Sequence, residues 1–169
     1  ELEDTLWLNR PRISRTEPHV RHKIADLRTV AHLPAAKVLV FADDLDHLTP
    51  IFETLPESVR LMPSGRYPFM QLMAQGADKV TALRPLVESW GCTLDHVVAF
   101  GDDINDVDLL RGARLGVAVA NAFPPALDAA DYVAPSNEED GVAQVLEALL
   151  AAPRTSTGVG ALLSSYPDR

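Results

Sequence analysis

The sequence is poor in cysteine and has fewer basic than acidic residues. Cys92 is the single cysteine among 169 residues, which excludes an internal disulfide. Fifteen lysine and arginine residues stand against 24 acidic ones, so the formal net charge is -9. Nucleic acids and anionic membranes need a basic face, and we therefore expect neither as a partner. An anionic small molecule stays open as a ligand, because a bound metal ion can invert the local field.

Long apolar runs and targeting signals are also lacking. No stretch approaches the ~20 apolar residues of a membrane span, and the first residues lack the charged-then-apolar pattern of a secretory signal. The sequence therefore predicts a cytoplasmic protein. Its 47% hydrophobic and 23% charged residues are ordinary for a globular protein.

The second half of the sequence alternates predicted strands and helices. We predict strands at residues 97–100, 115–120 and 132–133, and helices at 79–90, 105–111, 124–129 and 139–150. This alternation favours an α/β fold with a parallel sheet. Pro85 falls inside the first of these helices and indicates either a kink or a later start.

The first half has a weaker pattern. Residues 1–16 predict irregular structure or a short edge strand, and the apolar spacing over 17–33 predicts a helix. The next elements are predicted as strands at 37–42, 58–63 and 69–73 with a short helix at 47–55. Residues 153–169 are rich in Ser, Thr, Gly and Pro, which is typical of a mobile tail.

The strongest functional signal is an apolar run that ends in Gly101 and is followed by Asp102, Asp103 and Asp106. Acidic groups after a strand of an open α/β sheet lie where such sheets bind ligands. Two carboxylates ~4 Å apart repel by about 4 kcal/mol at an effective dielectric near 20, so the cluster favours a bound cation. Magnesium suits hard oxygen ligands and often bridges carboxylates to a phosphate. A helix start decorated with Asp is the alternative.

Spacing suggests which of these side chains act together. Asp102 and Asp106 are about one helical turn apart, so both can face one point. Asn105 can present its amide to a phosphate oxygen or to a carboxylate. Asp103 and Asp108 are expected to serve as caps or to face solvent.

Lys79 is the second candidate, because it opens a predicted helix directly after Gly76-Ala77-Asp78. A lysine is unfavourable at a helix start, where the dipole is positive. An anion or a carboxylate cluster opposite the ammonium group would offset that cost. The alternative is an ordinary surface lysine.

Four motifs follow one another in a fixed order, namely Gly76-Ala77-Asp78-Lys79, residues 100–106, residues 116–122 and Ala130-Asp131-Tyr132-Val133. Together they resemble the haloacid dehalogenase (HAD) superfamily, and more narrowly the Cof-type sugar phosphatases of class IIB. The resemblance covers residues 76–150. It implies the C-terminal half of a HAD-like Rossmannoid parallel sheet with part of an α+β cap. The implied domains are a partial cap over 1–75, a core over 76–152 and a flexible tail over 153–169.

The resemblance also implies roles for the candidate residues. Lys79 would hold the transferring phosphoryl group, and Asp102 would bind Mg²⁺ directly. Asp106 would bind the metal through water or hold Asn105, which lies near the phosphate. Asn121 would line the opening of the same phosphate site.

In the cap, the resemblance makes Arg66, Tyr67 and Gln71 candidates for contact with the substrate. The implied activity is that of a magnesium-dependent phosphomonoesterase. It would act on a small phosphorylated metabolite, of sugar or polyol type, through an aspartyl-phosphate. A mutase is a related possibility, because phosphomannomutases look similar in this region.

The nucleophile of the family is an Asp two residues before a second Asp, and it precedes the cap. We expect this chain to begin inside the cap, so the nucleophile segment is expected to be absent and the chain inactive by itself. A complementing N-terminal segment or a second copy of the chain, paired through an exposed sheet edge, is the expected protein partner.

Two other functions stay open. Asp44 and Asp46 follow a predicted strand, and with Ser64 they could form the site of a compact capless phosphatase. The segment between Asp46 and Ser64 is short for that arrangement. The chain could also be a non-catalytic HAD-like remnant that binds a partner or a metabolite.

Overall fold

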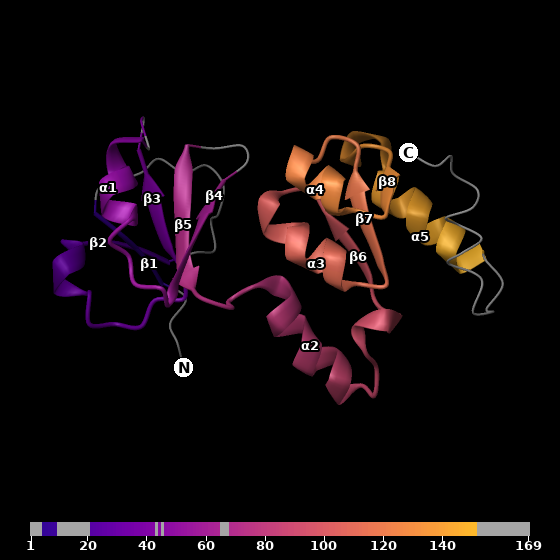
Figure 1. Cartoon of the computed structure of the whole chain (residues 1–169), viewed down its shortest axis with the longest axis horizontal. Helices are drawn as coiled ribbons and strands as arrows, with labels where there is room; N and C mark the ends of the chain where they lie inside the picture. The colour runs from indigo at the N-terminus through magenta and orange to yellow at the C-terminus, as the bar shows by residue number, and fades with distance from the viewer. Residues whose placement is uncertain (1–4, 10–20, 43, 45, 65–67, 152–169) are drawn as a thin grey trace. The chain divides into compact units, whose positions relative to one another are not determined.

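The computed structural model describes residues 5–9, 21–42, 44, 46–64 and 68–151 (Figure 1). The chain divides into two compact units, residues 1–36 and 37–169. The domain boundaries expected after residues 75 and 152 stay a prediction, and the tail expected over 153–169 lies outside the described residues. No helix in the described part of the chain is long and apolar enough to cross a membrane.

The first unit contains two short parallel strands. β1 (Thr5–Leu8) pairs with β2 (Arg21–Ile24), and the 3-10 helix η1 (Leu27–Thr29) follows. β1 agrees with the short strand considered for this region. The helix predicted over 17–33 is wrong for the described residues 21–33. Its apolar spacing is compatible with either structure, and pairing with β1 together with the Asp26 cap of η1 favours the strand and short turn.

A three-stranded antiparallel sheet begins the second unit. Its strands are β3 (Val38–Phe41), β4 (Val59–Pro63) and β5 (Phe69–Ala74), in the order β3-β5-β4. The 3-10 helix η2 (Asp46–Leu48) and α1 (Thr49–Phe52) connect β3 to β4. Phe52 lines a shallow pocket with Leu61 and Met70, so α1 lies against one face of this sheet. The predicted strands and the short helix are confirmed.

A parallel sheet follows in the order β6-β7-β8. Its strands are β6 (Val98–Gly101), β7 (Leu115–Val119) and β8 (Tyr132–Ala134). The α-helices around it are α2 (Lys79–Ser89), α3 (Val107–Gly112), α4 (Pro124–Ala129) and α5 (Gly141–Ala151). Short 3-10 helices lie at η3 (Leu94–His96), η4 (Ile104–Asp106) and η5 (Asn137–Glu139).

The sequence predicted each of these strands and α-helices. α2 begins at Lys79 and continues through Pro85, so the alternative of a later helix start is wrong. Pairing between two copies through a sheet edge stays a prediction, and β6 is the end strand of this sheet.

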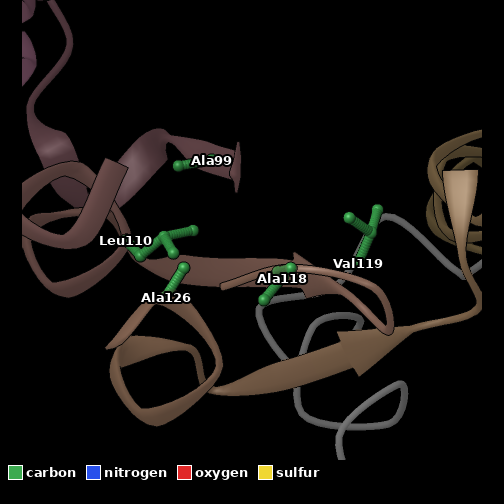
Figure 2. Close-up of a cluster of buried hydrophobic side chains, with 6 residues drawn as sticks. Ala99, Leu110, Ala118, Val119 and Ala126 are labelled. Atoms are coloured by element: carbon green, nitrogen blue, oxygen red, sulfur yellow. The ribbon is translucent and has the colours of Figure 1, made fainter. Parts of the chain in front are cut away.

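The core surrounds β7, which is buried along its whole length. One cluster, drawn in Figure 2, joins side chains of β6, β7, α3, α4 and the loop after β7; it comprises Ala99, Leu110, Ala118, Val119, Ala122 and Ala126. In a second cluster, Leu115 and Val117 pack with Tyr132, Ala134 and Val145 of β8 and α5. A parallel strand covered on both faces needs an apolar run of this kind. The core fixes the position of the strand ends, where the polar residues begin.

Candidate functional site

The candidate site is built where β6 ends and η4 begins. The carbonyl of Asp102 accepts a hydrogen bond from the Phe123 amide at 2.8 Å, which ties the end of β6 to the start of α4. Oδ1 of Asp103 accepts from the Ile104 amide at 2.7 Å and caps η4. The expectation that Asp103 serves as a cap is therefore confirmed. This cap turns the chain so that Asp106 points back toward the end of the strand.

Asp106 lies at the centre of the site. Only 6% of its side chain is exposed. Oδ2 accepts hydrogen bonds from the backbone amides of Asp102 at 3.1 Å and Asp103 at 3.2 Å, and Oδ1 pairs with Nζ of Lys79. A buried carboxylate is stable only when it is paired and hydrogen-bonded, and these three donors meet that need.

Gly101 makes room for this carboxylate. A Cβ atom built on Gly101 would lie 2.5 Å from Cβ of Asp106, a distance that side chains do not adopt. The packing of Asp106 over the strand end therefore requires glycine at this position. Sequence reasoning noted that a glycine closes the strand but did not assign it this role.

Lys79 reaches the site from the first turn of α2. Asp78 caps that helix, because its Oδ1 accepts from the Thr81 amide at 2.7 Å. This bond is the main cause that lowers the pKa of the Asp78 carboxyl. The negative charges of Asp78 and Asp106 offset the unfavourable position of an ammonium group at a helix start. About half of the Lys79 side chain is exposed, so the ammonium group faces both Asp106 and solvent.

The remaining predicted residues are less closely connected. Asn105 is half-buried in η4. Asn121 follows β7, and its amide group donates to Oδ1 of Asn137, whose backbone amide donates back at 3.3 Å. The structure thus joins Asn121 to the start of η5, which follows β8. Asn137 was not predicted, although it follows a predicted strand as Asn121 does. Arg66 and Tyr67 lie outside the described residues.

Two further predictions concern acidic residues. Asp108 was expected to cap a helix or face solvent, but its Oδ2 accepts from Nη2 of Arg60 at 2.7 Å. Asp44 accepts from the Asp46 amide and pairs with His47. Both Asp44 and Asp46 follow β3, a strand of the antiparallel sheet. The capless alternative needs them after a strand of the parallel sheet, so we do not retain it.

The donor set suits a magnesium ion only in part. Within the described residues, no group of three or more His, Cys, Asp or Glu side chains is placed to hold a metal ion. Asp106 already accepts three hydrogen bonds, whereas Asp102 is exposed beside it. Magnesium is commonly held by one or two carboxylates with water and substrate phosphate completing its shell. The magnesium site expected at Asp102 and Asp106 stays a prediction.

A family model described as haloacid dehalogenase-like hydrolase matches residues 3–146. This chain belongs to that family. The HAD-like chain is 34% identical over 105 residues to 5-amino-6-(5-phospho-D-ribitylamino)uracil phosphatase YcsE of Bacillus subtilis (strain 168), covering 62% of the chain and 42% of that protein. The family expected from the sequence motifs is confirmed.

Two solved structures support the fold. A haloacid dehalogenase-like hydrolase from Bacteroides thetaiotaomicron has 35% sequence identity and a TM-score of 0.63, over 76% of the HAD-like chain and 49% of that chain. A sugar phosphatase of HAD subclass IIB has 23% identity and a TM-score of 0.65, over 76% and 47%, and shows the fold alone. The HAD-like chain spans about half the length of these proteins.

Proposed function

We propose that this chain supplies the lysine and acidic residues of a magnesium-dependent HAD phosphatase. The enzyme would hydrolyse a small phosphorylated metabolite through an aspartyl-phosphate. The observation that carries the proposal is the pairing of Lys79 with Asp106 beside the amides of Asp102 and Asp103. The three aspartates lie directly after β6, at the carboxyl edge where open α/β sheets bind ligands, and Lys79 meets them from the first turn of α2.

Each side chain has a distinct part in this proposal. The Lys79 ammonium, partly exposed, would bind a phosphoryl oxygen as a point charge. Asp102 and Asp106 would hold Mg²⁺, and the ion would neutralise phosphate charge and orient the substrate when bound. Asn105 and Asn121 would donate amide hydrogen bonds to the phosphate or to the site's carboxylates. Arg66 is retained as a candidate for contact with the substrate.

One relative supports a substrate class. The name of the Bacillus subtilis relative states a phosphate carried on a ribitylamino chain, which is of the sugar and polyol monophosphate type. We therefore propose a monophosphate of this class as the substrate, in the cytoplasm.

The proposal assigns the carboxylate nucleophile to a segment that complements the described residues. Phosphoryl transfer needs this carboxylate in line with the leaving oxygen, and positioning supplies much of the rate enhancement. Lys79 and Asp106 would already be in place when that segment docks, because the protein itself satisfies Asp106 with hydrogen bonds.

The test compares the 169-residue chain with the longest polypeptide that the same reading frame encodes. Phosphate release from a panel of sugar and polyol monophosphates is measured with and without Mg²⁺. We expect background rates from the 169-residue chain and magnesium-dependent turnover from the longer polypeptide. In the latter, Lys79→Met and Asp102→Asn should each lower kcat by about 100-fold or more.

Asp46→Asn is the matched control, since it removes one carboxylate from the antiparallel region and should leave kcat unchanged. Unchanged turnover in Lys79→Met, or equal turnover without Mg²⁺, would contradict the proposal. An inactive longer polypeptide that still binds phosphate esters would instead favour the non-catalytic binding module.

A further inference from the structure

Arg60 connects the antiparallel sheet to the helix that follows the candidate site. It lies on β4, and its Nη2 donates to Oδ2 of Asp108 at 2.7 Å. Asp108 occupies the first turn of α3, two residues after Asp106. β4 also contacts η4 directly. The ion pair therefore joins residues 48 positions apart, at the start of the helix whose N-cap is Asp106.

Arg60 also acts on the start of α2. The Thr81 amide is the main cause that lowers the pKa of Asp78, and the charge of Arg60 lowers it further. Asp78 is the N-cap of α2, and the next residue is Lys79. The charge of Arg60 thus acts on the N-cap of α2, and its guanidinium group pairs with Asp108 in the first turn of α3, the helix whose N-cap is Asp106.

This arrangement has a direct electrostatic consequence. Asp78 and Asp108 flank the Lys79–Asp106 pair along the chain, and each carries a carboxylate that can attract an ammonium group. Arg60 offers these two carboxylates another cation. In the structure Lys79 is paired with Asp106, which also accepts hydrogen bonds from the amides of Asp102 and Asp103.

The Arg60–Asp108 pair differs from an ordinary surface ion pair. About 30% of the Arg60 side chain and 43% of the Asp108 side chain are exposed. The Arg28–Asp26 pair joins residues two positions apart, and 90% of the Arg28 side chain is exposed. Exposed pairs of the second kind contribute little, since solvent screens them and two long side chains lose freedom. Arg28 therefore offers a matched control for removal of one guanidinium group.

We propose that Arg60 is a positioning residue of the candidate site: through its ion pair with Asp108 it fixes the start of α3 and so keeps Asp106 in place for Lys79. It acts through these residues and does not touch the phosphoryl group. Its role in catalysis rests on the proposed function, whereas its role in local geometry does not. The placement of the groups that would hold the phosphate then depends on the position of β4.

The test measures hydrogen exchange at the amides of Asp102 and Asp103, which donate to Asp106. Arg60→Gln, Asp108→Asn, the double variant and the control Arg28→Gln are compared at one pH in the 169-residue chain. We expect Arg60→Gln to accelerate exchange at these two amides by about three- to ten-fold, the net effect of one ordinary hydrogen bond. Buried amides of β7 should exchange at unchanged rates, and Arg28→Gln should change neither set.

The double variant decides how Arg60 acts. If Arg60 works through Asp108, Arg60→Gln adds little to Asp108→Asn, and Arg60→Lys restores part of the protection. Unchanged exchange at Asp102 and Asp103 would overturn the proposal, as would equal acceleration throughout β7. If Arg60→Gln fails to fold, Arg60→Lys is measured in the same way and must show a smaller change confined to the same amides. No substrate is used, so this result and the phosphatase assay fail independently.

Discussion

The parallel and antiparallel sheets of the second unit bury their side chains to very different degrees. All five residues of β7 are buried, and Leu110, Leu115 and Val117 are fully enclosed. In the antiparallel sheet, only Met62 and Gln71 among the described strand residues are buried, whereas Val38 and Leu39 are 44% and 38% exposed. A strand covered on both faces gains apolar burial at every residue, and a strand covered on one face gains it at alternate residues.

This difference suggests that the two sheets have different roles. The parallel sheet supplies a closely packed support, and close packing holds side chains in defined rotamers. The candidate site follows directly from its end strand. The antiparallel sheet has fewer buried side chains, and it contributes Arg60. We therefore expect substitutions in the parallel sheet to lower the free energy of unfolding more than substitutions in the antiparallel sheet. Substitutions at the end of β6 are expected to change the geometry of the candidate site.

The largest expected difference compares two leucines. Leu110→Ala leaves a cavity in a fully buried cluster and should reduce the free energy of unfolding by about 3 kcal/mol. Leu39→Ala removes a side chain that is 38% exposed and should cost about 1 kcal/mol. Denaturant unfolding followed by circular dichroism measures both. Equal losses would contradict the comparison, and a separate early transition in Leu39→Ala would show that the two sheets unfold independently.

A second pair of substitutions compares a glycine beside the candidate site with a glycine in a helix that packs on the parallel sheet. Gly101→Ala places a methyl group 2.5 Å from Cβ of Asp106, and we expect a loss of about 2 kcal/mol with faster amide exchange at Asp102 and Asp103. Gly112→Ala is the control, because its nearest neighbour is a Val80 methyl at 3.1 Å that can yield. Its unfolding free energy should change by less than about 1 kcal/mol, since alanine also favours the helix. Retained protection at Asp102 and Asp103 in Gly101→Ala would refute the proposed packing.

The smallest expected effect concerns the cap of α2. Asp78→Ala should lower the free energy of unfolding by about 1 kcal/mol at pH 7. The folded pKa of Asp78 is below its ordinary value of 3.8, mainly because of the Thr81 amide. Its charge therefore stabilises the folded chain above the unfolded pKa, and this contribution is lost as the pH falls through the folded pKa.

Urea unfolding of both proteins at pH 7 and near pH 3 checks this sign. The difference between wild type and Asp78→Ala should shrink at the lower pH. Asp78→Asn keeps a capping oxygen without the charge, so it should lose less stability than Asp78→Ala. If the difference between wild type and Asp78→Ala instead grows as the pH falls, the charge of Asp78 is not the cause of the stabilisation.

Much of the second unit could be predicted because its signals are local. The run at Leu115–Val119 is apolar throughout, and Gly91 adopts a positive φ directly after the predicted end of α2. The helix predicted over 17–33 failed because its apolar spacing also fits β2, and pairing with β1 is not visible in the segment itself.

The site was predictable in part for the same reason. The spacing of Asp102 and Asp106 indicated a common location, and the structure brings the amide of one to the carboxylate of the other. The contacts that depend on distant residues were not visible. Arg60 meets Asp108 across 48 positions, and Asn121 meets Asn137 because two parallel strands end side by side. Tertiary packing creates these neighbours, and sequence spacing does not record them.

Pro85 gives α2 a mechanical property that bears on Lys79. Proline has no amide hydrogen, so the carbonyl of Thr81 loses the helical bond that residue 85 would otherwise donate. The first turn of α2 is then joined to the rest of the helix by fewer backbone hydrogen bonds. Asp78 still caps this turn at its N-terminus. We expect this opening turn to tilt more easily than the rest of α2, whose Val87 is buried, so that the ammonium group of Lys79 can shift slightly relative to Asp106.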